Sequence, residues 1–192
     1  NAFGNVKINN LKRNFEITTE KVNFNYKEDI LLSETKSIIN DNFKNVLIAD
    51  KFHYQLKKDL LKIQELKFTD YNNNLLELST AYINTKTNNL FGKDVLVKLN
   101  NKTFNKTNEP RLRGNSLKNN TDSTEIVKGV FTTCKKRDGC PPWQLSANKI
   151  EHDKKERKIK YEDAILKIYD FPVVYFPKFF HPDPTVKRQS GF

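Results

Sequence analysis

Short groups of apolar residues recur along the chain, and each group follows a cluster of polar residues that favour turns. The groups lie at 30–32, 46–47, 60–61, 75–76 and 90–91, so the interval is about fifteen residues. Fifteen residues are too few for a helical repeat unit, which needs about 33. They can hold one β-strand and a turn, with Asn and Asp supplying the turn residues. The pattern therefore predicts a β-meander or a β-repeat.

Apolar and polar side chains alternate within these segments with the period of two that a β-strand imposes. The residues expected to share an apolar face are Phe52 with Tyr54, Leu66 with Phe68, Leu76 with Leu78, Thr80 and Tyr82, and Val95 with Val97 and Leu99. The opposite face carries Lys51, His53, Lys67, Glu77 and Lys98. This alternation predicts sheets that are apolar on one side.

Other segments are less regular. A helix competes with strands at 56–66, where Leu56, Leu60 and Ile63 have helical spacing, and at 150–168, which is rich in Lys and Glu. The polar composition of residues 100–125 predicts loops with one short strand around 111–117. Residues 171–184 hold four of the seven prolines, which predicts an extended, aromatic-rich connector and confines any strand there to a sheet edge.

The composition fits one folded domain with a thin or one-sided core. Leu, Ile, Val and Phe make up 55 of the 192 residues, which is above the level typical of disordered chains. The formal net charge of +11 suggests an anionic partner such as nucleic acid, an acidic glycolipid or a membrane surface. The 24 asparagines reduce the weight of that charge, because joint Lys and Asn richness can reflect codon usage. No apolar stretch is long enough for a transmembrane helix.

The two cysteines, Cys134 and Cys140, favour a short-loop disulfide, which would indicate an oxidising compartment. Bonds to cysteines outside this sequence and free thiols are the alternatives. A zinc site needs about four ligands, and only the distant His53, His152 and His181 could complete one. We therefore expect no metal and no cofactor.

Catalytic motifs are missing from the sequence, which has no nucleophile elbow, zinc-protease motif or phosphate loop. Adjacent Glu162 and Asp163 would point to opposite faces of a strand, so they do not form a carboxylate pair. We expect a non-enzymatic protein. Basic residues interleaved with aromatics at 149–161 keep a second hypothesis open: a basic, β-rich module that binds nucleic acid or an acidic glycan.

Several motifs in the last third of the chain resemble a known family. They are Gly129-Val-Phe-Thr-Thr-Cys134, Cys140-Pro-Pro-Trp-Gln-Leu-Ser-Ala-Asn-Lys-Ile-Glu-His-Asp153, Tyr161-Glu-Asp-Ala164, Pro172-Val-Val-Tyr-Phe-Pro177 and His181-Pro-Asp-Pro-Thr-Val-Lys-Arg-Gln-Ser-Gly-Phe192. In this order they resemble the LptD family of lipopolysaccharide (LPS) assembly proteins, also called OstA or organic solvent tolerance proteins. The similarity covers 129–192. Residues 1–128 share no such motifs. They resemble the OstA-type periplasmic domain of the bridge proteins of that pathway only in their succession of short predicted strands.

The resemblance implies an all-β fold of the OstA or LptA type, a β-jellyroll of two facing antiparallel sheets that form an open-ended groove. It implies a periplasmic jellyroll domain at 1–170. The connector at 171–192 would then lead into an outer-membrane β-barrel that is absent from this sequence. It also implies a location at the periplasmic face of the cell outer membrane.

The function implied is LPS transport and assembly, with the domain acting as a hydrophobic conduit that passes lipid to the barrel. The partners implied are LPS, an LptA-like bridge protein and, through the barrel, an LptE-like plug lipoprotein, with no nucleic acid. The expected lipid-binding residues are Phe52, Tyr54, Leu66, Phe68, Leu76, Leu78, Tyr82, Val95, Val97, Ile159 and Tyr161, and ordinary core packing is the alternative role for each. Some family members link this domain to the barrel through widely separated cysteines, which the close pair Cys134 and Cys140 does not match.

Overall fold

The structure is a computed structural model that describes residues 1–100, 108–135 and 141–182. It is all-β, which confirms the predicted class. The strands are β1 (Ala2–Asn10), β2 (Phe15–Asn25), β3 (Ile30–Ser33), β4 (Ser37–Asp41), β5 (Val46–Ala49), β6 (Lys51–Gln55), β7 (Leu60–Thr69), β8 (Leu75–Asn84), β9 (Asn89–Lys98), β10 (Arg111–Asn119), β11 (Ser123–Thr132), β12 (Trp143–Asp153), β13 (Lys158–Ile168) and β14 (Phe171–Pro182). Within the described ranges, the only helical element is one 3-10 turn, η1 (Leu56–Lys58).

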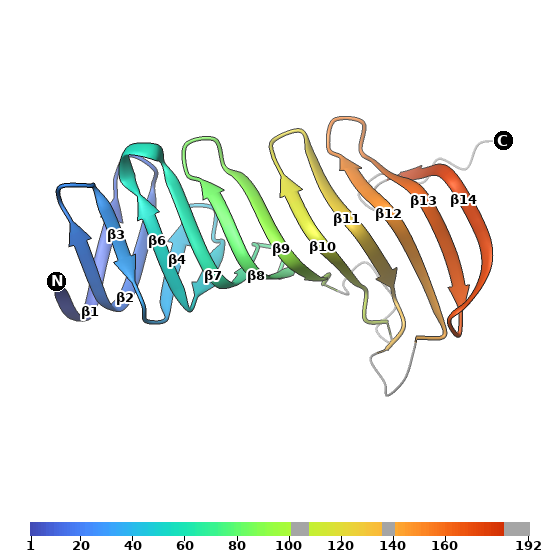
Figure 1. The fold of residues 1–192 in the computed structure, drawn as a ribbon, viewed down its shortest axis with the longest axis horizontal. Coiled ribbons are helices and arrows are strands. Elements are labelled where there is room, and N and C mark those ends of the chain that lie inside the picture. The colour runs from blue at the N-terminus through green and yellow to red at the C-terminus, as the bar shows by residue number, and fades with distance from the viewer. Residues whose placement is uncertain (101–107, 136–140, 183–192) are drawn as a thin grey trace.

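All fourteen strands belong to one antiparallel sheet. From β7 to β14 each strand pairs with the next one along the chain, so the predicted meander is confirmed (Figure 1). At the amino-terminal end the sheet divides, because the first part of β2 pairs with β4 and its last part with β3. The β4 branch continues through β5, the β3 branch continues through β6, and both branches rejoin at β7.

Each long strand bends near its middle, and this bend gives the fold its cross-section. In β7 the inward residues are Leu61, Ile63, Leu66 and Phe68, so two consecutive side chains, at 64 and 65, face outward at the bend. Glu65 has a left-handed φ of 51°. The same outward position has a left-handed φ in β9, β11 and β13, at Asp94, Lys128 and Asp163. Strand β8 makes the same three-residue step, from Leu78 to Ala81, without such a residue.

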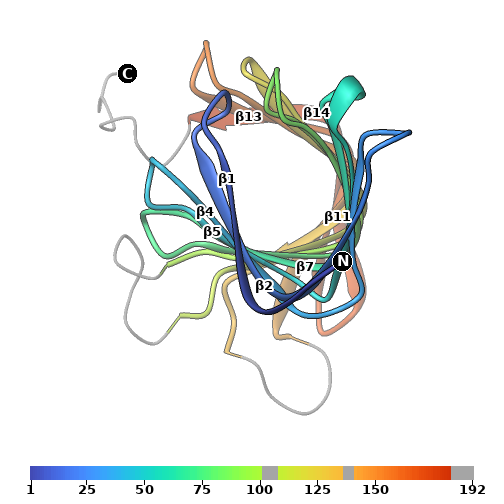
Figure 2. The same cartoon turned by 90° about the vertical axis from the view of Figure 1, so that its left-hand side faces the viewer.

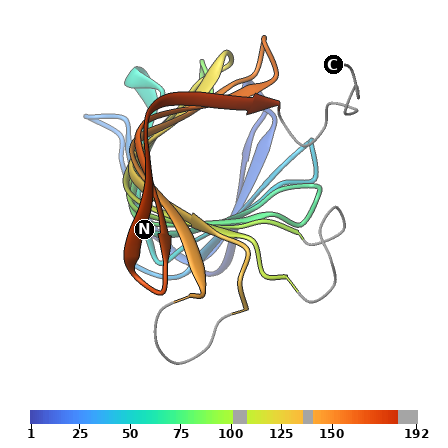
Figure 3. The same ribbon diagram turned by 90° about the vertical axis from the view of Figure 1, so that its right-hand side faces the viewer.

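The bend brings the two halves of each strand face to face, as the views along the long axis show (Figures 2 and 3). We call the half that contains β4, β5 and Phe68 arm A, and the half that contains β3, β6 and Ile63 arm B. The two facing sheets of the expected jellyroll are therefore two arms of one bent sheet. A jellyroll-like fold agrees with this architecture.

The space between the arms holds two groups of packed apolar side chains. The larger group runs from Ile17 to Ile126, and the smaller one surrounds Ala147, Ile150, Tyr161 and Ala164. A buried hydroxyl cluster lies where the chain crosses from arm B to arm A between β3 and β4. There the Oγ1 atom of Thr19 lies 2.9 Å from the Oγ atoms of both Ser33 and Ser37, so these buried polar groups satisfy one another.

The structure shows which secondary structure forms in the segments where helix and strand were both predicted. Residues 56–66 are the short η1 turn followed by β7, and residues 150–168 lie in β12, a turn and β13. The strand expected at 111–117 is β10. The proline-rich segment forms β14, which pairs with β13 and lies at the edge of the sheet. Among the described residues, no helix is long and apolar enough to span a membrane.

Candidate functional site

An unbroken row of apolar residues runs along the inner face of arm A. Each residue lies directly opposite the next one on the neighbouring strand. The row consists of Ile8, Ile17, Ile39, Leu47, Phe68, Leu76, Val97, Leu112, Phe131, Leu145, Leu166 and Val174. Since neighbouring strands are about 4.8 Å apart, twelve strands extend the row over roughly 50 Å. The strands that carry the row are stacked along the long axis of the molecule (Figure 1).

The exposure of this row changes along its length. Ile17 and Ile39 are fully buried, at 0% and 3% exposure. From Leu47 to Leu166 every member is only partly buried, and Val174 at the far end is 41% exposed. Side chains that face inward and remain partly exposed are available to an apolar ligand, because the opposite arm does not fully cover them.

Arm B presents a matching inner row closer to the bend. Its members, in cross-strand order, are Ser33, Phe52, Ile63, Ala81, Gly92, Leu117, Ile126, Ile150, Tyr161 and Phe179. The row is apolar except for two hydroxyl groups. One is that of Ser33, which belongs to the buried hydroxyl cluster, and the other is that of Tyr161. The arms therefore face each other with apolar surfaces along the whole sheet.

The residues at the bend change in size along the molecule. In β7, β8 and β9 the positions just on the arm A side of the bend hold Leu66, Leu78 and Val95, all at most 3% exposed. In β10 to β13 the corresponding positions hold Gly114, Gly129, Ala147 and Ala164. Large apolar side chains therefore line the bend in β7–β9, whereas in β10 and β11 the side chains of Ile126 and Ile150 pack over the glycines.

The structure places most of the sequence-predicted lipid-binding residues on the inner face, in two environments. The fully buried residues are Phe52, Tyr54, Leu66, Leu78, Val95 and Tyr161, with exposures from 1% to 5%. The partly exposed residues are Phe68, Leu76, Val97 and Ile159. The first set serves as core packing in this structure, whereas the second set presents accessible apolar surface.

Tyr82 is the exception, and the expectation that Thr80 and Tyr82 share a face with Leu76 and Leu78 is wrong. The three-residue step between Leu78 and Ala81 moves the following residues out of phase, so Tyr82 faces outward. Its outer neighbours confirm this position: Lys62 and Phe91 are its cross-strand partners, and the Lys62 ammonium group lies 5.7 Å from the centre of the Tyr82 ring.

An aromatic cluster lies at the carboxy-terminal end of arm B. The rings of Tyr161 and Phe179 are stacked, with centroids 4.5 Å apart and an interplanar angle of 3°. Phe176 packs against Phe179 at 5.0 Å. Burial raises the pKa of Tyr161 to about 12, and its hydroxyl lies 3.0 Å from Nε2 of His181. The cluster therefore ends the apolar face, with the Tyr161 hydroxyl and the His181 ring as its polar groups.

At the opposite end, Tyr54 connects the two arms. Its ring packs against Phe15 of β2, with centroids 6.1 Å apart. Its hydroxyl accepts a hydrogen bond from Nδ2 of Asn10 at 3.3 Å and lies 2.9 Å from Oγ1 of Thr85. Tyr54 is thus fixed from both arms, which accounts for its exposure of only 2%.

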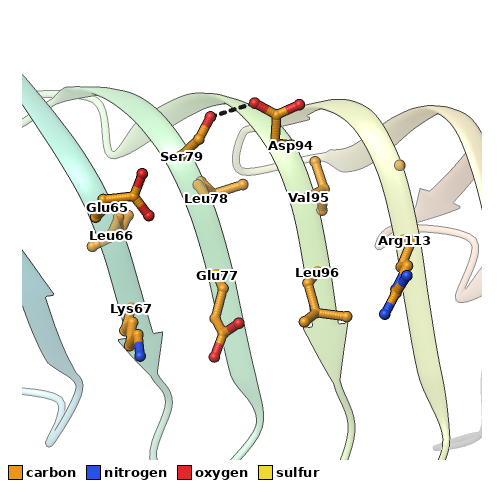
Figure 4. Close-up of a pocket in the computed structure, with 11 residues that line it drawn as sticks. Glu65, Leu66, Lys67, Glu77, Leu78, Ser79, Asp94, Val95, Leu96 and Arg113 are labelled. Atoms are coloured by element: carbon orange, nitrogen blue, oxygen red, sulfur yellow. Dashed lines mark hydrogen bonds between the residues drawn. The ribbon is translucent and has the colours of Figure 1, made fainter.

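A cavity of about 450 Å³ lies across β7–β10 at the bend (Figure 4). Its polar lining carries both signs of charge: Glu65, Lys67, Glu77, Asp94 and Arg113. The hydroxyl of Ser79 donates to a carboxylate oxygen of Asp94 at 2.5 Å (Figure 4). No group of three or more potential metal ligands occurs in the described ranges. The lining thus mixes acidic, basic and apolar side chains.

Cys134 lies just after β11 and is partly buried. Its backbone N–H donates to Oγ1 of Thr132 at 3.1 Å, and its carbonyl oxygen accepts a hydrogen bond from the guanidinium group of Arg111. Cys140 falls outside the described residues. The disulfide between these cysteines therefore stays a prediction, which non-reducing peptide mapping would test.

Sequence reasoning missed much of the arm A row. The missed members are Ile8, Ile17, Ile39, Leu47, Leu112, Phe131, Leu145, Leu166 and Val174. A spacing signal could have found Leu166, because β13 repeats the i, i+2, i+5 and i+7 spacing of apolar residues in β7 and β8, with Ile159, Tyr161, Ala164 and Leu166. A simple period of two fails at the bend.

The fold and the inner face together define a class of protein: a bent, jellyroll-like β-sheet with apolar surfaces facing each other. Comparison with known proteins finds a partial similarity to the LPS-assembly protein LptD of Pseudomonas putida (strain W619), 33% identical over 84 residues. LptD of Pseudomonas entomophila (strain L48) matches with the same identity and length. The matched segment covers 42% of this chain and 9% of each relative. No family model matches the chain.

Proposed function

We propose that this chain is a lipid-binding module of LPS transport and assembly, in which the facing apolar arms shield acyl chains from water. The unbroken apolar row of arm A carries this proposal. Burying a methylene group in an apolar environment is worth about 0.8 kcal/mol, so shielding a chain of about twelve carbons is worth on the order of 10 kcal/mol. A continuous row lets a chain move along the sheet without crossing a polar position.

The partial similarity to LptD supports the same pathway. In this proposal the module is the bent sheet including β14, so it extends beyond the boundary at 170 that the sequence suggested. It works at the periplasmic face of the outer membrane. It would receive LPS from an LptA-like bridge protein and pass it toward a barrel that holds an LptE-like plug lipoprotein. This role requires no cofactor and no catalytic residue.

A bridge protein of similar architecture would add a strand to an open edge of the sheet. The two edges are β1 and β14. Strand β14 contains Pro172, Pro177 and Pro182, which lack the N–H group that a new ladder needs, whereas β1 contains no proline. We therefore assign the bridge protein to β1.

Photo-crosslinking in cells tests the lipid path. A crosslinking amino acid at Phe68 or Val97, both partly exposed on the inner face, is expected to capture LPS. The same group at the adjacent outward positions Lys67 and Lys98 is expected to capture none, because neighbouring strand residues point to opposite faces. Equal capture from both faces would contradict the proposal. Salt-dependent binding of an oligonucleotide would favour the basic-module hypothesis instead.

A further inference from the structure

The inner face of arm B changes chemistry along one cross-strand row near its outer rim. From β3 to β9 the row is apolar except for the tyrosine hydroxyl: Leu31, Tyr54, Leu61, Ile83 and Leu90. From β10 to β14 it holds Asn119, Thr124, His152, Ile159 and His181. Four of the last five positions are therefore polar, and the change occurs between β9 and β10.

These polar side chains belong to the inner face. Asn119, Thr124 and His152 lie two residues from Leu117, Ile126 and Ile150, which are all buried on that face. Beneath the polar rim lies the apolar inner row of arm B, which ends in the stacked Tyr161 and Phe179. The carboxy-terminal half of arm B is thus layered, with apolar residues near the bend and polar residues at the rim.

Lys154 adds a positive charge to this rim. Its ammonium group donates to Oδ1 of Asn119 at 2.8 Å and to the backbone carbonyl of Asn120 at 2.5 Å. Within the described ranges it makes no ion pair, whereas the next residue, Lys155, pairs with Asp122 at 3.0 Å. Burial lowers the pKa of Lys154, and the charge of Asp122 partly opposes that effect. A partly buried cation held by neutral oxygens keeps its charge available to an anion.

We infer that this rim, formed by Asn119, Thr124, His152, Lys154 and His181, binds the phosphorylated headgroup of the amphiphile whose acyl chains lie on the apolar layer beneath. The inference rests on the proposed function and gives the bound lipid an orientation. The ammonium group of Lys154 supplies the charged donor for phosphate, and the side-chain NH2 group of Asn119 supplies a neutral donor. The hydroxyl of Thr124 donates to Oδ1 of Asn119 at 2.6 Å and so helps to fix that amide. The headgroup lies at the β10–β14 end, because the same row toward the amino terminus presents apolar side chains.

The test compares two forms of the lipid anchor of LPS, diphosphoryl and monophosphoryl lipid A, bound to this chain in the same detergent. Isothermal titration gives the dissociation constants for the wild type and for Lys154→Gln. We expect the wild type to bind the diphosphoryl form about tenfold more tightly, as the loss of one charge-assisted hydrogen bond implies. Lys154→Gln should remove most of that preference.

Two further variants serve as controls. Lys155→Gln removes the same charge one residue away, where the side chain is 72% exposed, and should keep the preference. Lys154→Arg should also keep much of it, and melting curves verify that each variant is folded. Equal affinity of the wild type for both lipids would overturn the headgroup site and leave the acyl-chain function standing. If the wild type binds neither lipid A nor a dodecyl-chain fluorescent probe, the proposed function fails as well.

Discussion

Arg13 and Asp59 form a two-point ion pair that joins the tips of the two arms. Nε of Arg13 donates to Oδ1 of Asp59 at 3.1 Å, and Nη2 donates to Oδ2 at 2.8 Å. Arg13 lies in the turn between β1 and β2 at the end of arm A, and Asp59 lies between η1 and β7 at the end of arm B. Together with the contacts of Tyr54, the pair bridges the open side of the bent sheet at its amino-terminal end.

This pair predicts a pH-dependent contribution to stability. Its hydrogen bond from Arg13 holds the pKa of Asp59 below its ordinary value. Because the folded-state pKa is depressed, the stabilisation is fully present above the unfolded-state pKa of about 3.9 and is lost as the pH falls through the folded-state value. Urea unfolding of the wild type and Asp59→Asn should show a difference at pH 7 and pH 5 that shrinks by pH 3.

Arg13→Gln should reproduce that pH profile, because it removes the other half of the same interaction. Asp29→Asn is a matched control, since Asp29 pairs with Lys57, whose side chain is 71% exposed, and exposed pairs contribute little. A stability difference for Asp59→Asn that stays constant from pH 7 to pH 3 would contradict the prediction.

The left-handed residues at the bends predict an unusual response to glycine. Lys128 has φ 52° in the middle of β11 and is exposed. A left-handed conformation costs a residue with a Cβ roughly 1–2 kcal/mol, and glycine avoids that cost. Lys128→Gly should therefore keep or raise the free energy of unfolding, whereas Lys128→Val should lower it by about 1–2 kcal/mol.

Denaturant unfolding of both variants measures these changes. The control is Val127, also exposed in β11 but without a positive φ, where Val127→Gly should destabilise as glycine usually does in a strand. If Lys128→Gly lost as much stability as Val127→Gly, the bend would not depend on the left-handed backbone.

The fold class could be predicted from the sequence because each half-strand is short and alternates regularly. Leu66 with Phe68, and Val95 with Val97, share the inner face as a period of two requires. The bends could not be predicted in the same way, because they depend on backbone conformation at Glu65, Asp94, Lys128 and Asp163, none of which is glycine. In β8 the same step occurs without a left-handed residue, and a period of two that ignores the step assigns Tyr82 to the wrong face.

The candidate site was harder to predict than the fold. The length of the arm A row depends on strand register across the whole sheet, and register is set by hydrogen bonding between segments far apart in the sequence. Phe68 is adjacent to Leu47 and Leu76 in the row, yet nothing in the local sequence of Leu47 distinguishes it from a core residue. The polar rim of arm B depends on register in the same way.

Gly114 tests how closely the strands pack at the bend. A Cβ atom there would lie 2.3 Å from Cγ2 of Ile126 and 3.2 Å from the carbonyl oxygen of Val127. The branched Ile126 side chain is stiff, so Gly114→Ala should lower the free energy of unfolding by about 1–3 kcal/mol. Ile126→Leu removes the methyl group at that position and should restore part of the loss in the double variant. Urea unfolding measures these changes. If the double variant loses as much free energy of unfolding as the two single variants together, the contact between these residues is contradicted.

Leu145 distinguishes accessible lipid surface from ordinary core. It lies in the middle of the arm A row, between Phe131 and Leu166, and is partly exposed. Leu145→Asn keeps the side-chain size but places an amide where acyl chains are expected to lie. An unpaired amide in an apolar environment costs about 1–3 kcal/mol, so the affinity for a dodecyl-chain fluorescent probe should fall about tenfold.

The matched variant is Ser146→Asn on the outer face, which should leave the affinity unchanged because the next residue of a strand points away from the interior. Leu145→Ala separates polarity from lost packing, since it removes side-chain volume without adding a polar group, and melting curves record any loss of stability in each variant. If Leu145→Asn and Leu145→Ala weaken binding equally, polarity is not the cause. If neither weakens it while the protein remains folded, the acyl chain follows another path, and the row along arm A is a core.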